Sequence, residues 1–194
     1  MLQKAIAAFA LEEERFDFTL PNCDLVPIVT GLGKTKAAAS LTKAIMETNP
    51  VFVINVGTAG SISRNVDDVV VGNHFFDRDR EKLKDFGAEY EIATKIPDIL
   101  PASAASLSKL GAVLGNINTG DDFVTSANLP NCDAIDMEAF ALAYCCKMFN
   151  LPFVSVKCIT DIVGKNSIKH WENKIADAKD SLKTFFNKIG QMPQ

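Results

Sequence analysis

Seven short apolar runs, rich in valine, isoleucine and phenylalanine, constrain the fold of this 194-residue chain more than any other feature. Most of them are too continuous for half-exposed strands, so they predict strands that are covered on both faces. Helical patterns lie between or after several of the runs, at Lys34–Thr48, at Glu138–Phe149 and along an apolar stripe from Trp171 to Ile189. This alternation predicts an α/β fold. The seven runs are Ala5–Leu11, Leu25–Thr30, Val51–Val56, Val69–Phe76, Val113–Asn118, Ala134–Met137 and Phe153–Ile159.

Composition excludes several classes of function. With 20 Lys and Arg against 24 Asp and Glu, the net charge is −4, so no basic field favours nucleic acid or an anionic membrane. The five cysteines form no CxxC pair, which indicates reduced thiols and a cytoplasmic location. No apolar stretch approaches the roughly 20 residues that span a bilayer. We therefore expect one cytoplasmic domain over residues 1–194, without membrane or nucleic-acid partners.

A glycine-rich turn, Thr30–Thr35, follows one predicted strand and opens a predicted helix. A P-loop needs a glycine where Ile28 stands, and a dinucleotide fingerprint needs one at Lys36. A nucleotide hydrolase built on residues 33–35 is therefore disfavoured. Two interpretations of the turn stay open: a purely structural turn, or a turn that contacts a ligand.

Acidic residues stand at the ends of predicted strands, where open α/β sheets place their ligands. Glu12–Glu14 closes the first strand and Asp161 follows the last one. Asp136 and Glu138 stand at a strand-to-helix junction, where a carboxylate either caps the helix or accepts hydrogen bonds from a polyol. Two separated carboxylates are the minimum for acid/base cleavage of a glycosidic bond. The charged run 77–82 is predicted to be a polar loop. A metal site of His74, Asp77 and Asp79 is disfavoured, because strand alternation puts His74 on the face opposite the two aspartates.

In chain order, these segments resemble the nucleoside phosphorylase superfamily, and most of all its branch of 5'-methylthioadenosine/S-adenosylhomocysteine nucleosidases and futalosine hydrolases. The resemblance implies a single-domain, three-layer α/β/α sandwich around a mixed, twisted sheet, a purine nucleoside substrate, no cofactor or metal, and a homodimer. The matching segments are Ala10–Glu14, Thr30–Lys34, Asn55–Gly60, Asp68–Val71, Thr119–Val124, Asp136–Ala139 and Ile159–Asp161.

The resemblance also implies a role for individual residues. Asp161 would be the general acid that protonates the purine, and Glu14 the base that activates water. Glu138 would accept hydrogen bonds from the ribose hydroxyls. The other substrate-binding residues would be Met137 beneath the sugar, Phe123 stacked on the base, Val124 at the edge of the base through its backbone, and Gly60 with Thr58 along the nucleoside.

Three functions fit this set of residues. Hydrolysis is favoured over phosphorolysis, because phosphate needs a cationic cradle and the chain has only four arginines, none of them in the glycine-rich turns. A catalytically silent nucleoside-binding protein with the same fold is the third possibility. The chain departs from the family at Lys157, where an arginine often precedes the catalytic aspartate by four residues. The compact segment Asp79–Pro101 and the short stretch Arg15–Pro27 depart as well, and they affect the 5' group more than the bond that is cleaved.

Overall fold

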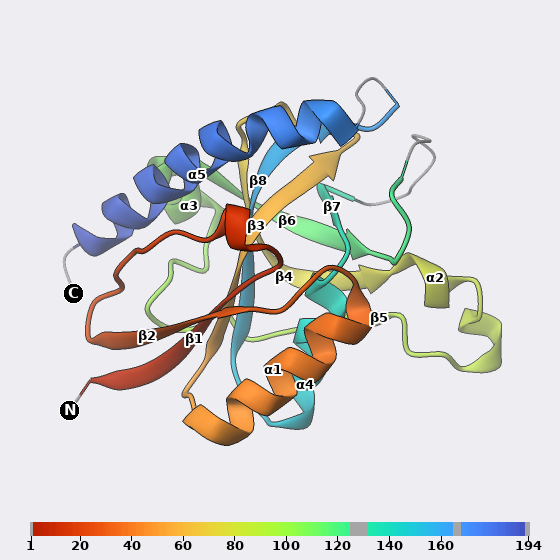
Figure 1. Ribbon diagram of the computed structural model, residues 1–194, viewed down its shortest axis with the longest axis horizontal. Helices are drawn as coiled ribbons and strands as arrows, with labels where there is room; N and C mark the ends of the chain where they lie inside the picture. Colours follow the sequence, from red (N-terminus) through yellow and green to blue (C-terminus); the bar gives the residue numbers. More distant parts are fainter. Residues whose placement is uncertain (1, 125–131, 165–167, 193–194) are drawn as a thin grey trace.

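A single mixed sheet organises the chain in the computed structural model, which describes residues 2–124, 132–164 and 168–192. Eight strands build the sheet within these ranges, in the order β2-β1-β3-β7-β6-β4-β5, and β8 pairs with both β3 and β4 (Figure 1). The strands are β1 (Gln3–Phe9), β2 (Cys23–Val29), β3 (Val53–Ser61), β4 (Val69–Asp77), β5 (Glu91–Ala93), β6 (Ala112–Thr119), β7 (Ala134–Asp136) and β8 (Phe153–Ile162).

The double pairing of β8 closes part of the sheet on itself. β8 runs parallel to β3 and antiparallel to β4, and β6 runs parallel to both β4 and β7. The ring is completed by one pair between β3 and β7, Gly60 with Ile135. Near the end of β3, strands of opposite direction therefore meet, because β3 and β7 are antiparallel there.

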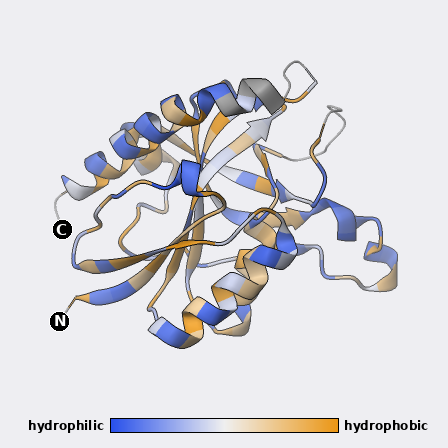
Figure 2. Cartoon of the chain, viewed as in Figure 1, coloured by the Kyte–Doolittle hydropathy of each residue, from blue (hydrophilic) through white to orange (hydrophobic). Residues whose placement is uncertain are grey.

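Helices cover both faces of the sheet and make three layers (Figure 1). Alternate residues of β1 show the two faces: Ala5, Ala7 and Phe9 join the core beneath α3 and α5, whereas Ile6 and Ala8 join the core beneath α1 and α4. Figure 2 shows the hydrophobic strands between these helices. The helices are α1 (Lys34–Thr48), α2 (Arg78–Glu81), α3 (Ala104–Leu110), α4 (Ala139–Met148) and α5 (Ile168–Gly190), with 3-10 turns η1 (Glu12–Glu14) and η2 (Lys84–Phe86).

The sequence-based elements are confirmed with small shifts at their ends. All seven apolar runs overlap strands, and α1 has the predicted bounds. The prediction of a polar loop over residues 77–82 is wrong, because Arg78–Glu81 forms α2 and the side chains of Asp77 and Arg78 are buried. Four further elements of the described residues, η1, β5, α3 and η2, were not predicted.

Candidate active site

A cavity of about 240 Å³ opens where the ends of β3, β7 and β8 come together. Both predicted catalytic residues, Glu14 and Asp161, line it. The remaining predicted site residues line it too, and together with Glu14 and Asp161 they come from five separate segments of the chain: Thr58, Gly60, Phe123, Val124, Met137 and Glu138. The closed part of the sheet thus gathers residues that lie up to 147 positions apart in sequence.

Glu14 is the last residue of η1 and is the one buried glutamate of the three in that turn. One of its carboxylate oxygens, Oε1, accepts a hydrogen bond from the backbone N–H of Thr58 at 2.9 Å and another from the Thr58 hydroxyl at 2.5 Å. The other oxygen, Oε2, is buried and has no hydrogen-bond partner among the described residues. Gly57 makes the approach possible, because a Cβ there would lie 3.1 Å from Oε2. Glu14 therefore presents one oxygen that is held and one that is available.

Asp161 lies near the end of β8, opposite Gly60 of β3. The Thr160 hydroxyl lies 2.9 Å from Asp161 Oδ1, and a Cβ at Gly60 would lie 2.9 Å from Asp161 Oδ2. The register of the two strands shifts at this point, between Ala59 and Gly60. The bulge and the missing side chain together let the carboxyl group fit against the neighbouring strand.

The N-terminus of α4 is capped by the side chains of Asp136 and Thr119, so the Glu138 side chain is not needed for capping. Asp136 Oδ2 accepts from the backbone N–H of Ala139 at 2.9 Å, and Thr119 Oγ1 accepts from the N–H of Phe140 at 3.0 Å. Glu138 itself makes no side-chain capping bond. Its Oε1 accepts instead from the N–H of Gly33 at 2.9 Å. Of the two interpretations left open by the sequence, helix capping therefore applies to Asp136 and not to Glu138.

A fully buried cation lies beside these carboxylates. Lys157 Nζ is 2.9 Å from Asp136 Oδ2, and both side chains are 1% exposed. Burial by itself would lower the pKa of Lys157, but the carboxylates of Asp136, Glu138 and Glu14 raise it, so the ammonium group stays charged. Burial and the repulsion of Asp136 raise the pKa of Glu138 to about 7. The wall of the cavity is thus acidic, and Lys157 is the counter-ion of Asp136 beside it.

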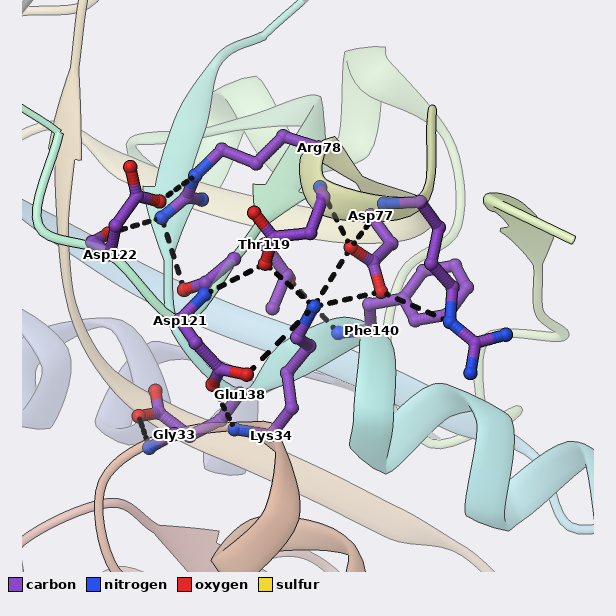
Figure 3. A network of polar contacts seen from close by, with 12 residues as sticks. Gly33, Lys34, Asp77, Arg78, Thr119, Asp121, Asp122, Glu138 and Phe140 are labelled. Carbon is purple, nitrogen blue, oxygen red and sulfur yellow. Dashed lines mark hydrogen bonds and ion pairs between the residues drawn. The ribbon is translucent and has the colours of Figure 1, made fainter. Parts of the chain in front are cut away.

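The loop after β6 is held by the side chain of Arg78 (Figure 3). The guanidinium Nε donates to Asp122 Oδ1 at 3.0 Å, Nη1 donates to the carbonyl oxygens of Asn118 and Asp136, and Nη2 donates to those of Gly120 and Asp122. Phe123 follows directly, lines the cavity and is 42% exposed. The arginine side chain is therefore committed to protein acceptors, and it fixes the loop that carries the aromatic ring.

The glycine-rich turn before α1 is closed by carboxylates. Lys34 donates its backbone N–H to Asp121 at 2.8 Å, and its ammonium group pairs with Asp77 and Asp79 (Figure 3). With the N–H of Gly33 engaged by Glu138, these donors already have acceptors, which contradicts a phosphate-binding interpretation. The turn nevertheless touches the cavity through Leu32.

Sequence reasoning did not nominate the two further lining residues whose side chains donate hydrogen bonds at the site, Trp171 and Arg78. It placed Trp171 in the apolar stripe of α5, but the side chain lines the cavity and its Nε1–H donates to Thr58 Oγ1 at 2.9 Å. It placed Arg78 in a polar loop. An Asp77 cap, which accepts from the N–H groups of Asp79 and Arg80, was the available signal that a helix begins there.

Other kinds of site find no support in the described part of the chain. Within residues 2–124, 132–164 and 168–192 no group of three or more His, Cys, Asp and Glu could hold a metal ion. His74 pairs with Glu91 at 2.6 Å. Over the same ranges, no helix is both long and apolar enough to cross a membrane.

Comparison with known proteins gives a consistent result. Residues 12–190 match the family model described as the phosphorylase superfamily. A 5'-methylthioadenosine/S-adenosylhomocysteine nucleosidase of Geobacillus sp. (strain WCH70) is 31% identical over 185 residues, which cover 80% of this chain and 79% of the relative.

Solved structures agree with the fold. The 5'-methylthioadenosine/S-adenosylhomocysteine nucleosidase of Neisseria meningitidis, in complex with methylthio-immucillin-A, has a TM-score of 0.81 at 24% identity and covers 97% of this chain and 98% of its own. A futalosine hydrolase mutant of Helicobacter pylori strain 26695 has a TM-score of 0.80 at 19% identity, with coverage of 97% and 98%.

Proposed function

Since this chain belongs to the phosphorylase superfamily, and within it to the nucleosidases that hydrolyse N-glycosidic bonds, we propose that it cleaves a 5'-substituted purine nucleoside of the methylthioadenosine or S-adenosylhomocysteine type. The products are the free base and the sugar. The observation that carries the proposal is the common cavity of Glu14 and Asp161, in which Glu14 has a buried oxygen without a partner among the described residues.

The chemistry requires two proton transfers. Asp161 gives a proton to N7 of the purine as the bond between C1' and N9 breaks, and the bonding electrons leave with the base. Water attacks C1', and Glu14 Oε2 accepts the proton that the water loses. Each of these acid and base steps accelerates the reaction by about 10²–10⁴-fold.

The acidic wall stabilises the sugar as it becomes positively charged. The transition state of glycosidic cleavage resembles an oxocarbenium ion, and carboxylates in a buried site interact with it more strongly than water does. Glu138, at the start of α4, accepts hydrogen bonds from the ribose hydroxyls, with Met137 packed beneath the sugar. Phe123 stacks on the purine, the backbone of Val124 reads its edge, and Gly60 and Thr58 lie along the nucleoside.

Water is the attacking nucleophile in this proposal rather than phosphate. Of the described arginines, Arg78 lines the cavity, and its donors already bind Asp122 and four backbone carbonyls. A phosphate ion would have to break that set of hydrogen bonds to find a cationic partner. Glu14, in contrast, would repel phosphate and bind water.

The proposal includes a cytoplasmic homodimer that needs no cofactor or metal. Support for an interface comes from η2, where the side chain of Phe86 is 87% exposed and that of Leu83 is 52% exposed. Sedimentation equilibrium should give twice the mass of the chain, and a monomer at micromolar concentration would contradict this part of the proposal.

The experiment measures release of free base by liquid chromatography. Methylthioadenosine, S-adenosylhomocysteine, adenosine and inosine are incubated with the protein, with and without phosphate. We expect turnover without phosphate, a loss of about 10²–10⁴-fold in both Glu14→Gln and Asp161→Asn, and retained nucleoside binding in Asp161→Asn. Glu13→Gln is the matched control, because the Glu13 side chain is exposed and adjacent.

Two outcomes would contradict the proposal. Turnover that depends on phosphate and yields a sugar 1-phosphate identifies a phosphorylase. Binding of nucleosides by the wild type without base release identifies a silent binding protein.

A further inference from the structure

The one tryptophan of the chain connects α5 to the wall of the cavity. Trp171 lies in the first turns of α5 and is partly buried. Its indole Nε1–H donates to Thr58 Oγ1 at 2.9 Å, across 113 positions of sequence. A residue that is part of an apolar helix face thus makes a specific polar contact at the site.

The contact has a direction that follows from the chemistry of the groups. An indole N–H can only donate a hydrogen bond, whereas a threonine hydroxyl accepts through its lone pairs and has one proton to donate. With Trp171 as donor to Thr58 Oγ1, the hydroxyl proton of Thr58 goes to Glu14 Oε1, 2.5 Å away. The order of donation is therefore from Trp171 to Thr58 to Glu14.

This order determines which oxygen of Glu14 is available for chemistry. Oε1 accepts both from the hydroxyl and from the N–H of Thr58, whereas Oε2 has no partner among the described residues. Hydrogen bonds to a carboxylate are stronger than neutral ones, so rotation that exchanges the two oxygens is disfavoured. Oε2 lies against Gly57, where a Cβ would come within 3.1 Å of it.

We propose that Trp171 is a positioning residue for the hydrolysis, which acts through Thr58 to hold Glu14 with Oε2 towards the attacking water. The inference rests on the proposed function, because it assigns Glu14 the role of the base. It makes the docking of α5 a condition for base catalysis, since the tryptophan is correctly placed only when the start of that helix lies against β3.

A double-mutant cycle tests the coupling. The variants are Trp171→Phe, which keeps an aromatic ring but removes the N–H, Thr58→Val, which removes the hydroxyl, and the two combined. We expect kcat to fall about threefold to tenfold in Trp171→Phe and about tenfold to hundredfold in Thr58→Val. In the Thr58→Val background the tryptophan replacement should cost at least threefold less, because the hydroxyl through which it acts is gone. The effect on kcat of the smaller phenylalanine ring is the same in both backgrounds, so it cancels when the two costs of Trp171→Phe are compared.

A spectroscopic measurement tests the contact independently of activity. A nitrogen-15 correlation spectrum contains one indole N–H signal, because the chain has one tryptophan. Thr58→Val should shift this signal and accelerate its exchange with solvent, and Thr58→Ser should restore both, together with kcat to within about threefold of wild type.

If Glu14→Gln is inactive, two results would overturn this inference without overturning the proposed function. One is a double-mutant cycle in which the two effects on kcat are additive, and the other is an indole signal that Thr58→Val leaves unchanged. A Glu14→Gln variant with wild-type activity would instead overturn the proposed function, and the inference with it.

Discussion

Replacing Gly60 by alanine tests whether the position of the Asp161 carboxyl group matters for the reaction. A Cβ at Gly60 would lie 2.9 Å from Asp161 Oδ2, and ordinary van der Waals contact begins near 3.4 Å. The carboxyl group must therefore move by about 0.5 Å. The backbone has little freedom to relieve the contact, since Gly60 pairs with Asp161 on β8 and with Ile135 on β7.

The effect on catalysis should be measurable in a protein that remains folded. A misplacement of about 1 Å can cost about 10²-fold in rate, so a shift of half that size predicts a loss of about tenfold to hundredfold in kcat/KM, or about 1.4–2.7 kcal/mol. Overpacking of a buried site costs about 1–3 kcal/mol of stability. The variant should therefore remain folded at room temperature.

The assay combines base release with thermal unfolding. Gly190→Ala is the control, because a Cβ there meets nothing within 4 Å and the residue ends α5 away from the cavity. Both variants should give native circular dichroism, and only Gly60→Ala should lose activity. Wild-type kcat/KM in a folded Gly60→Ala protein would refute the assignment of Asp161 as the group that protonates the base.

Three further predictions follow from the charges around the cavity. Folding raises the pKa of Glu138 from 4.5 to about 7, so the contribution of this carboxyl group to stability is full below pH 4.5 and is lost as the pH rises to about 7. The Tm of Glu138→Gln should therefore fall less than the Tm of the wild type over this pH window. An identical dependence of Tm on pH in the two proteins would contradict this prediction. Arg78→Lys should raise KM at least tenfold and lower the free energy of unfolding in urea by about 2–4 kcal/mol, because an ammonium group cannot donate to Asp122 and the backbone carbonyls together. An unchanged KM would show that the loop carrying Phe123 keeps its position without the arginine. Lys157→Met should lower stability by about 3–5 kcal/mol because Asp136 is left buried without its counter-ion, and adding Asp136→Asn should recover part of the loss; a double variant less stable than the single one would argue against the ion pair.

Local sequence was sufficient for the secondary structure that depends on neighbouring residues. The bounds of α1, and the strands β4, β6 and β8 to within three residues, follow from hydrophobic periodicity, since burial on one or both faces requires it. Helix α3 could also have been found, because Ser103 caps its first turn and Gly111 ends it with a φ of 79°.

The tertiary structure alone decided how polar groups are paired. The donors of Arg78 reach acceptors at positions 118 to 136, and the indole of Trp171 reaches Thr58 across 113 residues. Neither contact leaves a trace in local composition, because a charged or amphipathic side chain is buried only when distant segments supply partners for it.

The same distinction applies to the candidate site. Motifs in chain order, through their resemblance to a known family, were enough to nominate Glu14, Glu138 and Asp161. Which oxygen of Glu14 is held, which acid caps α4 and which cation balances the carboxylates became visible only in the folded chain. Hydrogen bonds depend on distances of a few tenths of an ångström between residues far apart in sequence, and folding sets those distances.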